Sequence, residues 1–103
     1  MLEAIEQVES FVTGMNQAEF EADKRTLFAC IRGLEILGEA ARHVGEDIKI
    51  LHPQVDWQDT VGLRNFVTHQ YFAVDNEVLW KVIKQHLPVM KPQLQQVLQA
   101  LST

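Results

Sequence analysis

The chain has 103 residues, of which 47% are hydrophobic, and a formal net charge of −5 at pH 7. This length supports one hydrophobic core, so residues 1–103 are expected to form a single domain. No apolar run reaches the roughly 18 to 20 residues that span a bilayer, and the first residues are acidic where a secretory signal peptide would be basic, which predicts a cytoplasmic protein without a membrane segment.

The first half of the chain predicts two helices. Residues 2–13 place apolar side chains three and four positions apart, and Gly14 is a suitable stop for this helix. Asn16 followed by Glu19 has the spacing of a capping box, so a second helix should open there and continue for roughly 27 residues to Gly45. One apolar stripe runs along this second helix and comprises Phe20, Leu27, Phe28, Ile31, Leu34, Leu37, Ala41 and Val44.

The second helix also contains two glycines and the single cysteine of the chain. A glycine inside a helix costs about 1 kcal/mol relative to alanine. Gly33 and Gly38 are therefore expected where another helix approaches closely, either within the chain or across a dimer contact. Cys30 has no partner for an internal disulfide, and its apolar neighbours predict a buried, unreactive thiol.

The middle of the chain predicts a connection and a third helix. Residues 46–55 contain a proline and mixed polarity, which is typical of a loop with a short helical turn. Asp56 can cap a helix that begins there. On a continuous helix Arg64 and His69 would stand about 140° apart, and their side chains could not easily converge. We therefore expect this helix to end near Val67 to His69, so that the imidazole can turn toward the guanidinium.

Two further helices are expected near the C-terminus. Asp75 can cap the fourth, and Pro88 and Pro92 are typical of the entry of a fifth. Trp57 and Trp80 lie on apolar helix faces, where core packing is more common than base stacking. Since no segment alternates with period two, we predict an all-α protein, a compact bundle of four to five helices without strands.

The segment from residue 64 to residue 71 concentrates side chains that suit phosphodiester chemistry. Arg64 stays charged and offers paired donors to phosphate oxygens, whereas His69 can gain or lose a proton near neutrality. Asn65 follows the arginine directly, and Tyr71 is expected in the loop after the helix. Each residue also has a structural alternative: a surface arginine with a capping amide, an imidazole bonded to backbone, and a packed tyrosine.

The remaining histidines predict no metal site. His43, His52 and His86 lack a second ligand-type residue at metal-binding spacing, so we expect them on the surface or at helix caps, and we expect no cofactor.

Charge is distributed unevenly along the chain. The net charge is −6 for residues 1–23, −1 for residues 24–60 and +2 for residues 61–103. Because lysine and arginine provide the affinity for phosphate backbones, any RNA contact is expected to centre on the second half. The acidic first helix should face away from RNA or toward a basic partner.

Several of these segments together resemble a known family. The chain resembles the HepT-like branch of the HEPN superfamily, which consists of small helical ribonuclease toxins. The first helix is shorter at its start than is usual in that family. The resemblance covers nearly the whole chain and depends on residues 34–41, Pro53, Trp57, residues 62–65, residues 69–72, Trp80, Leu87 and Pro88, with Arg-Asn-x-x-x-His-x-Tyr as its most specific part.

The resemblance implies an assembly, a partner and a further site residue. HEPN ribonucleases are typically homodimers whose paired motifs line one cleft. HepT-like proteins usually work with an MntA-type nucleotidyltransferase antitoxin, which attaches AMP to the tyrosine that corresponds to Tyr71. Glu39 is implied as a supporting residue and a candidate partner for Arg64.

These residues lead to an expected function and two alternatives. The expected function is metal-independent cleavage of RNA, in which His69 moves protons, Arg64 stabilises phosphorane charge and Asn65 holds a phosphate oxygen or the imidazole. One alternative is a non-catalytic module that binds nucleotide or RNA for a nucleotidyltransferase partner. The other is a purely structural helical dimer.

Overall fold

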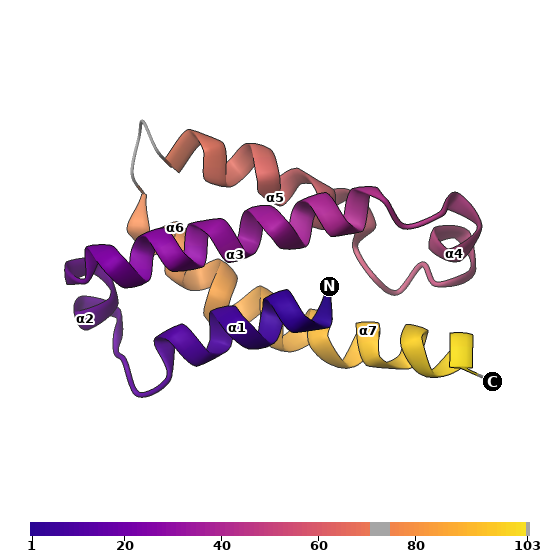
Figure 1. Cartoon of the computed structure of the whole chain (residues 1–103), viewed down its shortest axis with the longest axis horizontal. Helices are drawn as coiled ribbons and strands as arrows, with labels where there is room; N and C mark the ends of the chain where they lie inside the picture. Colours follow the sequence, from indigo (N-terminus) through magenta and orange to yellow (C-terminus); the bar gives the residue numbers. More distant parts are fainter. Residues whose placement is uncertain (71–74, 103) are drawn as a thin grey trace.

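The computed structural model describes residues 1–70 and 75–102, except for the side chains of residues 69 and 70. All regular secondary structure in this part of the chain is helical, which confirms the predicted all-α bundle (Figure 1). No helix in it is long and apolar enough to cross a membrane. The helices are α1 (Leu2–Val12), α2 (Gln17–Ala22), α3 (Lys24–Arg42), α4 (Glu46–Leu51), α5 (Trp57–Gln70), α6 (Asn76–Lys81), the π-helical η1 (Val82–His86) and α7 (Leu87–Ser102).

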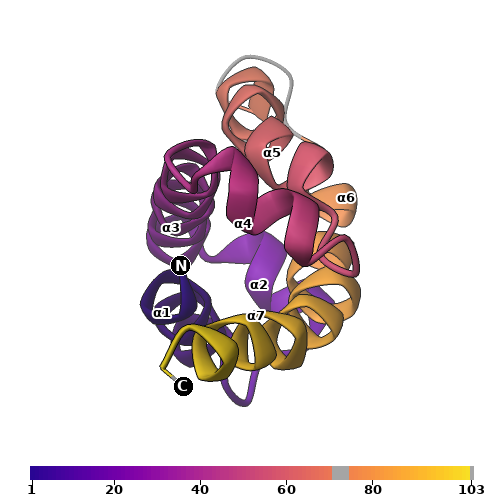
Figure 2. The ribbon, with the colours of Figure 1, turned by 90° about the vertical axis from the view of Figure 1, so that its right-hand side faces the viewer.

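Helix α3 lies at the centre of the arrangement. α5 packs on one side of it and α1 on the opposite side, while α7 runs beneath α1 (Figures 1 and 2). α2 contacts α6 and closes the end of the bundle where the chain turns from α1 into α3. The molecule is elongated along α3, with extents of 43 × 27 × 17 Å.

One apolar core joins these helices. Ile5, Val8 and Val12 form the buried stripe of α1, at the spacing that the sequence predicts. Besides these three residues of α1, the fully or nearly buried apolar side chains are Phe20, Cys30, Ile31, Leu34, Leu37, Ala41, Val55, Val67, Leu79, Ile83, Leu87, Leu94 and Val97. Phe28 was expected in the buried stripe of the second helix, but 61% of its surface is exposed.

The tryptophans and the cysteine lie where the sequence places them. Trp57 and Trp80 are partly buried against the core. The indole N–H of Trp57 donates to the carbonyl of His52 at 2.9 Å, and the ring of Trp80 lies 5.0 Å from that of Phe20. Cys30 is fully buried, and burial raises the pKa of its thiol to about 12. A thiol with that pKa stays protonated and unreactive.

The predicted long second helix is two helices. The capping box of Asn16 and Glu19 is present, but α2 ends at Ala22 and α3 begins at Lys24. Asp23 causes the break: its carboxylate accepts hydrogen bonds from the backbone N–H and the hydroxyl of Thr26, at 3.2 and 2.9 Å. These bonds also lower the pKa of Asp23. An N-cap residue has an extended backbone, so the chain bends there.

Both glycines of α3 are used for contacts within the chain. A Cβ on Gly33 would collide with Cγ2 of Val8, on α1. A Cβ on Gly38 would lie 2.9 Å from the backbone nitrogen of Arg64 and 3.2 Å from the carbonyl oxygen of Thr60, on α5. The backbones of α3 and α5 therefore touch at Gly38. A dimer contact is not needed to explain either glycine.

The C-terminal helices differ from the prediction in one respect. Asp75 caps α6 as expected, since its carboxylate accepts from the backbone N–H of Val78 at 3.1 Å. No break follows, because α6, η1 and α7 form one uninterrupted helical path. Pro88 has no N–H, and its ring would collide with a carbonyl one turn earlier in a regular α-helix. The wider π-helical turn that precedes it relieves that conflict, and Pro92 lies inside α7.

The glycine contacts generate a stability prediction. Gly38→Ala should lower the free energy of unfolding by roughly 1 to 3 kcal/mol, because the new methyl group meets backbone atoms that cannot move without separating α3 from α5. Gly62, on α5, provides a matched control, since a Cβ there meets nothing within 4 Å. Gly62→Ala should raise the stability by up to about 1 kcal/mol through helix propensity.

Denaturant unfolding followed by circular dichroism measures both variants. Equal stabilisation by the two alanines would show that α3 and α5 are not in backbone contact at Gly38.

Candidate functional site

The candidate site is built on α5, which begins at the predicted cap. Asp56 accepts a hydrogen bond from the backbone N–H of Asp59 at 3.0 Å, and its carbonyl accepts one from the hydroxyl of Thr60 at 2.7 Å. Thr60 and Val67 face inward and are buried. Arg64 comes four residues after Thr60 and three before Val67, so it stands on the side of α5 that faces α3, with its side chain 52% exposed. Asn65 is exposed.

The end of α5 differs from the prediction. The helix continues through His69 to Gln70, so the expected end near Val67 to His69 is wrong. On a continuous helix Arg64 and His69 stand about 140° apart around the axis and about 7.5 Å apart along it. The side chain of His69 and the whole of Tyr71 lie outside the described residues.

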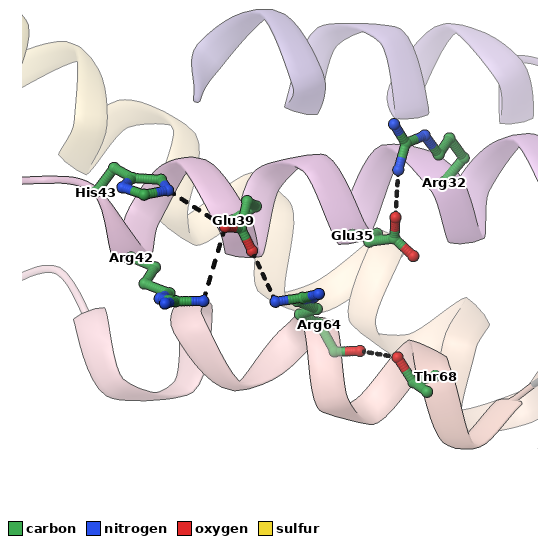
Figure 3. Close-up of polar contacts among 7 residues, drawn as sticks. All are labelled: Arg32, Glu35, Glu39, Arg42, His43, Arg64 and Thr68. Carbon is green, nitrogen blue, oxygen red and sulfur yellow. Dashed lines mark hydrogen bonds and ion pairs between the residues drawn. The ribbon is translucent and has the colours of Figure 1, made fainter.

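Arg64 is paired with Glu39, as the resemblance implied. Its Nη1 lies 3.1 Å from Oε2 of Glu39, which is on α3 (Figure 3). The position of this carboxylate follows from its neighbour in sequence, because Gly38 brings the backbones of α3 and α5 into contact. The side chain of Arg64 remains 52% exposed. The guanidinium of Arg64 is therefore paired with Glu39, while about half of the side-chain surface stays accessible to a ligand.

Glu39 also contacts two residues at the C-terminal end of its own helix. Its Oε1 lies 3.2 Å from Nε2 of His43 and 3.8 Å from Nη1 of Arg42 (Figure 3). Its Oε2 is buried and accepts no hydrogen bond from the described residues, so the contact with Arg64 is an ion pair without hydrogen-bond geometry. A buried, unbonded carboxylate oxygen is costly unless a positive charge lies close, and Arg64 provides that charge.

The sequence analysis missed two members of this network. His43 was expected at the surface or at a cap; it is exposed and caps the C-terminus of α3, and it also pairs with Glu39. Arg42 was given no role. Both lie three or four residues after Glu39, and that spacing of opposite charges on a helix was the available signal.

Two surface grooves lie along α5. One, of about 340 Å³, is bounded by α3 and includes Glu39, His43 and Arg64. The other, of about 790 Å³, lies between α5 and the η1–α7 segment and has a mixed lining that includes Phe66 and Met90 as well as Asp59 and His86. The smaller groove contains Arg64. Among the described side chains, no three His, Cys, Asp or Glu residues are grouped as metal ligands.

Comparison with known proteins identifies the family. Residues 1–97 match the family described as Ribonuclease HepT-like. The chain is 44% identical to a probable ribonuclease HepT of Thermococcus cleftensis over 89 residues, which cover 86% of this chain and 81% of that protein. It is 38% identical over 95 residues to a protein of Methanocaldococcus jannaschii named as a candidate RNase, covering 92% of this chain and 87% of the relative.

A third relative, from Caldanaerobacter subterraneus subsp. tengcongensis and also named as a candidate RNase, is 31% identical over 88 residues, which cover 85% of this chain and 79% of the relative. No solved structure matches the chain. The family match spans nearly the whole chain, and these relatives are aligned over most of their own length. The chain belongs to the HepT-like ribonuclease family.

Proposed function

We propose that the protein is a metal-independent endoribonuclease toxin whose site contains Arg64, Asn65 and His69. The observation that favours this function most is the state of Arg64: its guanidinium is fixed on one side by Glu39 and half exposed on the other. A fixed, accessible guanidinium can stabilise charge that develops on a phosphoryl group. The family match and the names of the relatives agree with an RNase.

The reaction needs only groups that this motif contains. The 2′-hydroxyl of RNA attacks the adjacent phosphorus, forming a new O–P bond while the bond from phosphorus to the 5′-oxygen breaks. His69 accepts the proton of the 2′-hydroxyl or gives one to the 5′-oxygen. Arg64 stabilises the phosphorane, and exposed Asn65 can hold a phosphate oxygen. The products are a 2′,3′-cyclic phosphate and a free 5′-hydroxyl.

A homodimer with shared sites is part of the proposal. One imidazole does not readily act as both acid and base in the same turnover, so two copies of His69 are needed. The continuity of α5 supports a dimer with shared sites, since Arg64 and His69 stand on different sides of that one helix. A second chain can supply the histidine that the arginine of the first chain faces.

Control by a nucleotidyltransferase antitoxin of the MntA type completes the proposal. Tyr71, two residues after His69, would receive AMP from this partner. The added phosphate would pair with Arg64 through charge-assisted hydrogen bonds, and the adenosine would occupy space that RNA needs. In the alternative function, the same residues bind nucleotide or RNA for that partner and cut nothing.

The first prediction concerns cleavage. The purified protein should cleave RNA in excess chelator and leave 2′,3′-cyclic phosphate ends, and Arg64→Ala or His69→Ala should each lower kcat by roughly 10²- to 10⁴-fold. Lys81→Ala is the matched control, because Lys81 is an exposed cation on α6 that pairs with Glu77 in its own helix. A requirement for added divalent metal would refute the mechanism, and binding of RNA without any cleavage would favour the alternative.

The second prediction concerns shared sites. Sedimentation at micromolar concentration should show a dimer. When equal amounts of wild-type and His69→Ala chains are unfolded and refolded together, half of the dimers should contain one chain of each kind and therefore only one His69. These mixed dimers should be inactive, so about a quarter of the activity of the same total amount of wild type should remain. If half of the activity remains, each His69 works in a separate site.

The third prediction concerns control. Coexpression with a nucleotidyltransferase encoded beside this protein should add adenylate to Tyr71, and mass spectrometry of the peptide that contains residues 71–74 should detect it. Tyr71→Phe should remove both the adduct and the protection from toxicity while leaving cleavage in place. Protection by the partner with Tyr71 unmodified would instead indicate that it blocks the site sterically.

A further inference from the structure

The groove beside Arg64 has features that the cleavage motif does not explain. It has a volume of about 340 Å³, at the small end of ligand pockets, which span roughly 300 to 1,000 Å³. Besides Arg64 and Glu39 it is lined by Arg32, Glu35 and Ile36, all on α3. The groove therefore extends from the proposed catalytic arginine along α3 to Arg32. Figure 3 shows Glu35 and Arg32 farther along that helix than Glu39.

The charges in this groove are arranged so that cations face outward. Arg32 pairs with Glu35, and the exposed fractions of the two side chains are 66% and 26%. Arg64 pairs with Glu39, and the exposed fractions of the two side chains are 52% and 39%. Each carboxylate is thus neutralised beneath more exposed cations. An approaching anion meets the positive groups first, although the chain as a whole is acidic.

Exposed apolar side chains alternate with these cations. Phe28, Arg32 and Ile36 follow one another at intervals of four residues, so they lie on one side of α3. Phe28 is 61% exposed and Ile36 is 45% exposed. Single-stranded RNA presents flat, apolar base faces between phosphates, and proteins bind it with exposed aromatic side chains beside a positively charged groove. This row has an exposed aromatic side chain, Phe28, beside a groove in which Arg32 and Arg64 are more exposed than the carboxylates they pair with.

We propose that the α3 row formed by Phe28, Arg32 and Ile36 is the subsite for the nucleotides next to the scissile phosphate. Arg32 contacts the neighbouring phosphate, Ile36 supports the adjoining ribose or base, and Phe28 stacks on the next base. The proposal rests on the ribonuclease function above. An acidic peptide or a second copy of this chain could also cover such a surface, but the groove is continuous with Arg64, where a phosphate must bind.

A fully 2′-O-methylated RNA oligonucleotide tests the subsite, because it has no 2′-hydroxyl nucleophile and cannot be cleaved. Fluorescence anisotropy at several salt concentrations should show that Arg32→Ala weakens binding roughly three- to tenfold and reduces the salt dependence by about one counterion. Phe28→Ala should weaken binding roughly fivefold or more without changing the salt dependence. Lys81→Ala, the matched control outside the groove, should stay within about twofold.

Cleavage kinetics and sedimentation of the same variants complete the test. Arg32→Ala should raise KM for unmodified RNA and change kcat little, because it acts on binding next to the reacting bond. Binding and KM that match those of Lys81→Ala would overturn the subsite while leaving the ribonuclease function in place. Retained, Arg32-dependent binding without any cleavage would overturn the ribonuclease function, and the row would then be an RNA-binding surface of a non-catalytic module.

Two further outcomes would assign the surface to another occupant. If Phe28→Ala converts a dimer to a monomer, and RNA affinity per dimer is unchanged when measured above the dissociation constant, the row is an interface between copies of this chain. If a polyglutamate peptide binds the wild type more tightly than the RNA does, and Arg32→Ala removes that binding, the groove recognises acidic protein instead.

Discussion

The backbone contact between α3 and α5 at Gly38 is the constraint on which the candidate site depends. Without a Cβ at this position, the two helices approach until the Cβ position of Gly38 is 2.9 Å from the backbone nitrogen of Arg64. The next residue on α3, Glu39, then lies directly opposite the side chain of Arg64. A larger residue at position 38 would move the carboxylate and the guanidinium apart, so one missing methyl group fixes both the packing and the site.

Net charge along the sequence is an incomplete guide to where this acidic chain exposes its cations. The charge of residues 24–60 is close to balanced, so counting charges along the sequence predicts a basic surface only in residues 61–103. On α3, however, Arg32 is more exposed than Glu35, and Arg64 of α5 is more exposed than the Glu39 it pairs with. Charge counted along a sequence does not record which member of an ion pair is more exposed to solvent.

The sequence predicted local features well because their causes lie within a few residues. Helix periodicity and caps depend on side chains three or four positions apart, which explains why the capping box at Asn16 and the caps at Asp56 and Asp75 are all present. The break at Asp23 was missed although its cause is equally local, since the continuous apolar stripe concealed the cap. Pro88 predicts the entry of a further helix, and α7 does begin beside it, at Leu87. The π-helical turn that joins α7 to α6 without a gap has no clear pattern in sequence.

The sequence by itself determined the all-α class, the family resemblance and the motif from Arg64 to Tyr71, and it identified Glu39 as a candidate partner. Only the tertiary structure decided which helix each glycine contacts, that Arg42 and His43 share the carboxylate of Glu39, and that Arg32 lies in the same groove as Arg64. The physical reason is distance along the chain. Arg32 and Arg64 are 32 residues apart, and their proximity depends on how α3 packs against α5, which no local pattern of residues records.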